Sequence, residues 1–333
     1  MTPSARLAEY AFNPTPSGAR LHRLETADGI VLRAASWPAR DPDACRGTIC
    51  LFQGRAEQIE KYFEVIDDLL ARGFAVATLD WRGQGGSARL LADPRKGHVR
   101  RFTDYERDLA VFREGVVEPL CPRPWFVLAH SMGGNVLLGH AARGGGDWIT
   151  RMVLTAPFLE FGRTPMSRAN VARLAATLTM LGMAGRYIPG PARDLAVVRA
   201  FEGNPLTHDP VRFARMTTFC EAEPDLTIDA PTIGWIQAAL GAITAFEDRR
   251  FAEKLTVPTL FIGSGADTLV STAAIERMAS RLKNAGYVFV PGARHEIMME
   301  SDRYRRQFLA AFDAFVPGSQ SASEAEPGTP PDA

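Results

Sequence analysis

Short apolar segments alternate with segments of helical spacing along most of the chain, and this alternation strongly limits the possible folds. The apolar runs that are typical of buried strands lie at 47–52, 74–79, 125–130, 151–156, 258–264 and 287–290. Strands that are apolar throughout are typical of a parallel sheet that has helices on both faces. The sequence therefore predicts an α/β protein with a mostly parallel central sheet flanked by helices.

One long segment, 158–251, interrupts the alternation. It contains several helical stretches and no convincing strand, and it lies between two predicted sheet strands. We therefore expect a helical cap inserted into an α/β core that comprises 19–157 and 252–316. Residues 1–18 are rich in proline and serine, which predicts a loose arm, and 317–333 lack any large apolar residue, which predicts a disordered tail.

Composition excludes several classes of protein. The 333 residues are 46% hydrophobic and 23% charged, which is the balance of a globular protein. Basic and acidic residues both number 38, so no net charge draws the chain to nucleic acid. The longest nearly apolar run, 174–185, is shorter than the about 20 residues that span a bilayer. The four cysteines lack the spacing of a zinc site, so we expect reduced thiols and no metal.

One serine lies in the sharp turn between a predicted strand and a predicted helix. The stretch from Ala129 to Gly134 reads AHSMGG, and its small residues allow the turn to pack tightly and to expose the hydroxyl of Ser131. The helix that follows directs the N–H of Met132 toward a developing oxyanion. The simpler interpretation is a serine that caps a packed helix, but the flanking elements favour a nucleophile.

A serine hydroxyl needs a base, and the base needs a group that orients it. His295 follows an apolar run and precedes a predicted helix, which places it at the edge of the sheet where ligands bind. His98 and His208 lie in other predicted loops and remain alternatives. Asp267 follows a strand and a Gly-x-Gly turn, and it completes the chain order Ser, Asp, His of the α/β hydrolases.

Two other carboxylates compete with Asp267 for the role of orienting acid. They are Asp80 and Glu160, and Asp80 precedes the serine, which is the wrong chain order. We interpret Asp80 as a hydrogen-bond hub for the glycine-rich turn after it. That turn, DWRGQGGSA, nearly matches a dinucleotide-binding fingerprint, but a proline and a glycine soon after it interrupt the helix that such a site needs.

Together these motifs resemble the serine hydrolases of the α/β-hydrolase fold, most closely the group of monoacylglycerol lipases and bacterial lysophospholipases. The resemblance covers roughly 21–315 and rests on the stretch Gln53-Gly54-Arg55, the turn after Asp80, the serine turn, Asp267 and His295. It implies the α/β-hydrolase fold with a helical cap and no cofactor. It also implies that the backbone N–H groups of Arg55 and Met132 form the oxyanion hole.

The sequence departs from this family at two positions. The family usually has histidine where this chain has Gln53, and glycine where it has Ala129. Alanine is small enough for the serine turn. Gln53 leaves open how the loop that carries the oxyanion donor is held.

The resemblance also suggests roles for the cap. Leu174, Leu178 and Leu181 fall on one predicted helix face, with Met183 close by. This face either packs on the core or forms a wall for an acyl chain, since flexible apolar side chains suit such ligands. We expect a cytoplasmic protein that contacts the inner face of a membrane peripherally, if at all, through this cap.

The leading hypothesis is a serine ester hydrolase that acts on a lysophospholipid or a monoacylglycerol, with Ser131 as nucleophile, His295 as base and Asp267 as orienting acid. One alternative is amide or peptide hydrolysis on the same triad, as in an aminopeptidase. That activity calls for an acidic cluster in the cap, for which Glu221 to Asp225 is the candidate. The other alternative is a catalytically silent binding protein, which the intact Ser, Asp, His order opposes.

Overall fold

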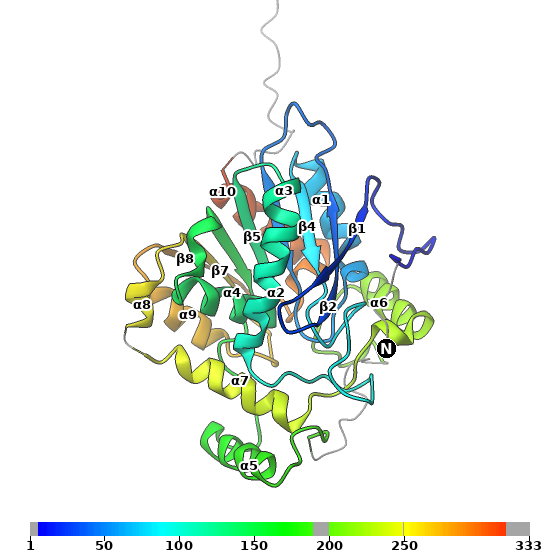
Figure 1. Ribbon diagram of the computed structural model, residues 1–333. Helices are drawn as coiled ribbons and strands as arrows, with labels where there is room; N and C mark the ends of the chain where they lie inside the picture. The colour runs from blue at the N-terminus through cyan, green and yellow to red at the C-terminus, as the bar shows by residue number, and fades with distance from the viewer. Residues whose placement is uncertain (1–5, 189–199, 249, 318–333) are drawn as a thin grey trace, which may run out of the picture.

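The computed structural model describes residues 6–188, 200–248 and 250–317, and a single eight-stranded sheet forms its centre (Figure 1). The strands are β1 (Arg20–Glu25), β2 (Val31–Trp37), β3 (Thr48–Phe52), β4 (Ala75–Leu79), β5 (Trp125–His130), β6 (Arg151–Thr155), β7 (Thr259–Ser264) and β8 (Ala285–Val290). Their order across the sheet is β1-β2-β4-β3-β5-β6-β7-β8. β2 pairs antiparallel with both β1 and β4, and the remaining pairs are parallel, so the predicted fold class is confirmed.

Helices cover both faces of this sheet. The core helices are α1 (Phe63–Ala71), α2 (Tyr105–Phe112), α3 (Glu118–Leu120), α4 (Met132–Ala142), α9 (Thr272–Arg281) and α10 (Asp302–Phe315). Because successive side chains of a strand point to opposite faces, each strand contributes to two cores. On β3, Cys50 and Phe52 pack with α2, α4 and α9, whereas Ile49 and Leu51 pack with α1 and α10. Burial on both faces is the reason that the central strands are apolar throughout.

Turns begin or divide several of these helices. A 3-10 turn, Ile59–Tyr62, precedes α1, and α2 lies between a 3-10 turn, Phe102–Asp104, and a π turn, Arg113–Val117. Helix α4 starts at Met132, directly after Ser131. The residue at 133, in the first turn of α4, must be glycine because a Cβ there would lie 2.7 Å from the carbonyl oxygens of Phe52 and Gln53.

Between β6 and β7 the described residues contain helices and no strand. They are α5 (Arg168–Met180), α6 (Pro210–Ala222), α7 (Ile233–Ala245) and α8 (Phe251–Lys254). We call the segment 158–251 the cap. Helix α7 contacts α4, and α5 packs on α7 on the side away from the sheet (Figure 1). The cap therefore lies beside the carboxyl end of β6, from which it leaves the core.

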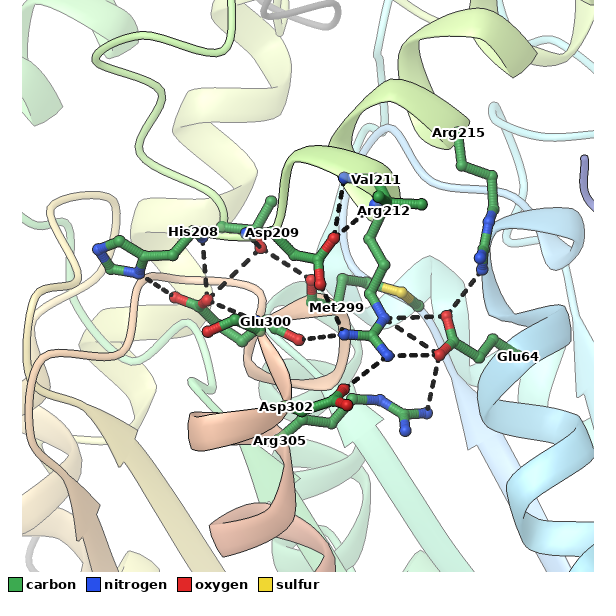
Figure 2. Close-up of polar contacts among 12 residues, drawn as sticks. Glu64, His208, Asp209, Val211, Arg212, Arg215, Met299, Glu300, Asp302 and Arg305 are labelled. Atoms are coloured by element: carbon green, nitrogen blue, oxygen red, sulfur yellow. Dashed lines mark hydrogen bonds and ion pairs between the residues drawn. The ribbon is translucent and has the colours of Figure 1, made fainter.

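Charged side chains tie cap helix α6 to the core (Figure 2). The Nη2 atom of Arg212 donates to Glu64 Oε1 of α1 at 2.6 Å and to Asp302 of α10 at 2.9 Å. Arg215 donates to the second oxygen of Glu64 at 2.7 Å. Burial alone would raise the pKa of Glu64, but Arg212 and its other arginine neighbours outweigh burial and lower it to about 2. The Glu64 carboxylate is thus ionised and joins α1 to α6.

The segment before β1 is not loose where the structure describes it. The N–H of Ala8 donates to Glu60 Oε1 at 3.1 Å, and the side chain of Asn13 donates to the Glu60 carbonyl at 2.9 Å. Glu60 also pairs with Arg33, and both are buried. Proline-rich sequence gives no periodicity from which such docking can be predicted. Residues 1–5, and the expected tail beyond 317, lie outside the described residues.

Candidate active site

Ser131 occupies a strained turn between β5 and α4. Its φ of 48° and ψ of −113° are rare for a residue with a side chain. Neighbouring backbone holds this conformation, because the Ser131 N–H donates to the Thr155 carbonyl at 3.0 Å and its own carbonyl accepts from the Phe158 N–H at 2.9 Å. Gly134, three residues on, cannot carry a side chain, since a Cβ there would lie 2.8 Å from the side chain of Pro157.

The structure brings the three expected side chains together. His295 Nε2 lies 3.1 Å from Ser131 Oγ, and His295 Nδ1 donates to Asp267 Oδ2 at 2.6 Å. The other carboxylate oxygen of Asp267 accepts from the N–H groups of Leu269 and Val270, at 2.8 and 3.0 Å. These two backbone contacts fix the carboxylate, and the carboxylate fixes the imidazole. Nε2 is therefore the ring nitrogen that is free to accept the serine proton.

The Asp267–His295 pair is electrostatically matched. Burial would lower the pKa of His295, but the Asp267 carboxylate outweighs burial, and the net effect is a raised pKa. Burial would likewise raise the pKa of Asp267, but His295 and the two N–H donors lower it. The carboxylate therefore stays ionised and stabilises an imidazolium when His295 takes up a proton.

The alternative histidines have other partners. His98 is hydrogen-bonded to Thr232 at 2.7 Å, and His208 to Glu300 at 2.7 Å. His130 lies next to the serine, but its Nδ1 contacts the Thr155 carbonyl at 3.1 Å, and burial lowers its pKa to about 3. None of them replaces His295 beside Ser131.

Asp80 acts as the predicted structural hub. Its buried carboxylate accepts from Arg33 Nε and from the Gly86 N–H, both at 2.7 Å, and from the Ile59 N–H at 3.0 Å. The glycine-rich turn wraps around it closely, since a Cβ at Gly85 would lie 2.2 Å from the Asp80 carboxyl carbon. The prediction for Asp80 is confirmed. Glu160, the other alternative, pairs with Arg168 at 2.8 Å.

The two expected oxyanion donors flank the serine. Met132 is the first residue of α4, so its N–H has no acceptor within the helix. Arg55 follows β3, and the preceding Gly54 approaches so closely that a Cβ on it would lie 3.2 Å from Ser131 Cβ. Arg55 and Met132 line the same cavity as Ser131 and His295. This position agrees with the proposed role.

Side chains that sequence reasoning missed hold the loop after β3. Gln53 Nε2 donates to Asp80 at 3.2 Å, and Trp81 Nε1 donates to the Gln53 carbonyl at 3.1 Å. Gln84 Nε2 donates to the Gly54 carbonyl at 2.8 Å. Thus the turn that begins at Asp80 supports the loop that carries Arg55. The glycine-rich turn after Asp80 was noticeable in the sequence, but no nearby residue pattern indicated which loop it would contact.

A cavity of about 280 Å³ opens beside Ser131. Its apolar walls include Phe158, Phe161, Leu206 and Trp235. Its charged wall contains Lys61, whose Nζ lies 2.7 Å from Glu57 Oε1 and 2.5 Å from Glu296 Oε1. In the part of the chain that the structure describes, no three His, Cys, Asp or Glu side chains gather to hold a metal ion.

A second and larger groove, of about 820 Å³, lies between α5 and α7. Leu174 and Leu178 line it, and Phe161 borders both this groove and the cavity at Ser131. Leu181 and Met183 are not among the residues that line either space. Of the residues expected to bind an acyl chain, Leu174 and Leu178 therefore line a groove that adjoins the site, and the other two do not.

Comparison with known proteins places this chain in a family. A family model described as serine aminopeptidase, S33, matches residues 43–302. The chain belongs to this family of α/β hydrolases. Proteins similar to this chain include lysophospholipase L2 of Escherichia coli, which is 32% identical over 89% of this chain and 87% of the relative. Another is the monoacylglycerol lipase of Mycolicibacterium smegmatis, 27% identical over 85% of this chain and 92% of the relative.

Solved structures show the same fold. The monoglyceride lipase of Saccharomyces cerevisiae, in complex with a substrate analog, superposes with a TM-score of 0.73 at 19% identity, and covers 93% of this chain and 99% of its own. The monoacylglycerol lipase of Paleococcus ferrophilus gives 0.65 at 22% identity, over 86% and 99%. The expected α/β-hydrolase fold and the resemblance to the lipase and lysophospholipase group are confirmed.

Proposed function

We propose that this protein is a serine ester hydrolase that cleaves the acyl ester of a lysophospholipid or a monoacylglycerol. The observation that carries the proposal is the hydrogen-bonded series Ser131, His295 and Asp267 at the wall of an apolar cavity. The relatives named lysophospholipase and monoacylglycerol lipase support this choice of substrate.

The proposed reaction follows from the positions of these groups. His295 Nε2 takes the proton of Ser131 Oγ as that oxygen attacks the acyl carbonyl. The N–H groups of Arg55 and Met132 stabilise the oxyanion, and Asp267 stabilises the imidazolium. His295 then returns the proton to the leaving alcohol, and an acyl ester remains on Ser131. Water, activated by His295, cleaves this ester, so the products are a fatty acid and the free enzyme.

Amide or peptide hydrolysis is the second candidate, because the family description names an aminopeptidase. An aminopeptidase needs a carboxylate that is free to bind the substrate's ammonium group. In the acidic segment 221–225, Glu223 pairs with Arg6 at 2.7 Å, and none of this segment lines the cavity. The carboxylates that do line it, Glu57 and Glu296, both hold Lys61. Among the described residues, the cavity thus offers no free carboxylate for a substrate's ammonium group.

Labelling with a fluorophosphonate probe tests the proposal directly. The probe should label the wild type at Ser131, and Ser131→Ala should abolish labelling and reduce turnover of a lysophosphatidylcholine by several orders of magnitude. His295→Gln should have a comparable effect, whereas His208→Gln, in a histidine bonded to Glu300, serves as the matched control and should keep most of the activity. Near-normal turnover by Ser131→Ala would reject a serine hydrolase.

We also propose that the cap contacts membranes peripherally. No helix in the described ranges is long and apolar enough to cross a bilayer. However, Met180 and Leu181, at the end of α5, are 88% and 69% exposed, and the exposed Arg173 and Arg186 lie near them in the sequence. Apolar side chains beside cations favour a surface of anionic lipid. Met180→Glu should therefore weaken co-sedimentation with phosphatidylglycerol vesicles. Val211→Glu, at a comparably exposed position on α6, should not, and equal effects would reject this contact.

A further inference from the structure

The side chain of Arg55 brings a positive charge to the cavity that contains Ser131. Its Nη2 atom donates to the backbone carbonyl of Asp229, and its guanidinium carbon lies 5.4 Å from the centre of the Trp235 ring. The Asp229 carboxylate is occupied elsewhere, by Arg95 at 2.6 Å. Among the described residues, no carboxylate forms an ion pair with Arg55.

The guanidinium is also short of hydrogen-bond acceptors. Arg55 Nε is buried without a hydrogen-bond partner among the described residues. Burial lowers the pKa of Arg55 to about 10, so the group remains a cation at neutral pH. A half-buried cation that lacks an anion has lost part of its hydration, and an arriving anion recovers part of that cost.

Arg55 is distinct from the other charges on the cavity wall. Lys61 lies between Glu57 and Glu296, at 2.7 and 2.5 Å, so these three side chains neutralise one another in part and leave no cation for a ligand. Arg55 is the lining cation without a carboxylate partner in the described part of the chain.

Packing holds the Arg55 side chain in place. Gly97 leaves room for it, since a Cβ at that position would lie 2.6 Å from Arg55 Nη2. The Trp235 ring beneath the guanidinium is stacked on Phe158 at 6.0 Å and packs against Phe102 at 5.6 Å. The guanidinium is therefore a preorganised site for an anion rather than a flexible surface charge.

We propose that the Arg55 guanidinium binds the phosphate of a lysophospholipid head group, which makes the site selective for lysophospholipids over uncharged monoacylglycerols. The inference rests on the proposed function and narrows its substrate. The planar fork of arginine matches the oxygens of a phosphate. The glycerol unit separates the phosphorus from the ester carbonyl by roughly 6–7 Å, about the length of an extended arginine side chain. One residue then holds the reacting carbonyl by its backbone N–H and the head group by its side chain.

Selectivity between two matched substrates tests this inference. The substrates are a lysophosphatidylcholine and a monoacylglycerol that carry the same octanoyl chain, both used below their critical micelle concentrations. Wild type should prefer the lysophosphatidylcholine in kcat/KM. Arg55→Met should reduce that preference on the order of tenfold to a hundredfold, which is the effect of losing a charge-assisted hydrogen bond. Arg55→Lys should retain part of it. Any disturbance of the oxyanion hole lowers both rates and leaves their ratio unchanged.

Arg281→Met is the matched control. It removes another arginine that donates to a backbone carbonyl of the cap, that of Phe246 at 2.7 Å, but Arg281 does not line the cavity, so the substrate preference should not change. A preference that Arg55→Met leaves intact, or that Arg281→Met reduces equally, would overturn the inference.

Inhibition provides a measurement that does not depend on lipid turnover. Glycerol 3-phosphate should inhibit p-nitrophenyl butyrate hydrolysis competitively and more strongly than glycerol, and Arg55→Met should raise its inhibition constant at least about tenfold. Equal inhibition of wild type and Arg55→Met would reject the phosphate site. If wild type binds glycerol 3-phosphate through Arg55 but hydrolyses neither lipid, the proposed lipid substrate fails while the anion site stands. The two proposals therefore fail separately.

Discussion

Replacing Asp267 by asparagine separates orientation of the base from stability of the fold. Asparagine keeps an oxygen for the Leu269 and Val270 N–H groups, which lie 2.8 and 3.0 Å from Asp267 Oδ1. It replaces the other oxygen, 2.6 Å from His295 Nδ1, by an NH2 group. Two N–H groups cannot face each other at that distance, so the imidazole adopts the tautomer that carries its proton on Nε2.

That tautomer cannot act as a base. Nε2, 3.1 Å from Ser131 Oγ, becomes a hydrogen-bond donor to the oxygen whose proton it should accept. In a Ser–His–Asp triad this change costs about 10⁴-fold in kcat, or about 5.4 kcal/mol of barrier. The assay is p-nitrophenyl butyrate turnover together with the thermal midpoint of unfolding. Asp267→Asn should lose about 10⁴-fold in rate, with a midpoint within a few degrees of wild type.

Asp80→Asn is the matched control, because it changes a carboxylate that lies in the core. Asp80 and its partner Arg33 are both buried, and weakening a buried ion pair costs about 3 kcal/mol or more. In a domain of this size that loss lowers the midpoint by roughly 6–10 °C. Asp267→Asn with more than about a tenth of wild-type activity, or Asp80→Asn with the larger kinetic defect and an unchanged midpoint, would refute our assignment of the acid.

Two further predictions concern pH and acyl chain length. kcat/KM should rise with pH as His295 loses its proton, and the Asp267 carboxylate raises the pKa at which this rise occurs. In Asp267→Asn the rise should therefore move to lower pH. A rise that stays at the same pH would show that a group other than His295 causes it. If an acyl chain follows Phe161 into the groove lined by Leu178, each added methylene should raise kcat/KM by up to about fourfold, or ~0.8 kcal/mol. Leu178→Asp should then cause a loss that grows with chain length. Best turnover of acetyl or butyryl esters by wild type would reject a lipid substrate.

The sheet was predictable from the sequence because its strands are buried on both faces. All five residues of β3 and all five of β4 are buried. Such strands appear in the sequence as continuous apolar runs, which can be recognised without knowing which side chains point to which face of the sheet. The helix bounds were less predictable, since tertiary contacts set them. Gly133 and Gly134 are poor helix formers, yet they lie in the first turn of α4, where a Cβ at 133 would lie 2.7 Å from the carbonyl oxygen of Phe52.

The candidate triad was predictable because each member follows a strand that the sequence marks clearly. Parallel strands end at the same edge, so Ser131, Asp267 and His295 were expected to lie near one another, and their distances agree with that expectation. The charges beside them were not predictable. Lys61 contacts a carboxylate far away in the chain, at Glu296. Arg55 donates to the Asp229 carbonyl, whereas the Asp229 carboxylate pairs with Arg95. Pairings of that kind depend on loops whose paths no local pattern reveals.

The departure of this chain from its family at Gln53 has a physical explanation in the same loops. What the structure requires of this residue is a side-chain N–H that reaches Asp80, here at 3.2 Å, and a carbonyl that accepts from Trp81. Glutamine and histidine both supply such an N–H, and any residue supplies the carbonyl. The rest of the support, from Gln84 to the Gly54 carbonyl, does not involve the side chain at 53. Gln53 thus keeps the connection between Asp80 and the loop that carries Arg55.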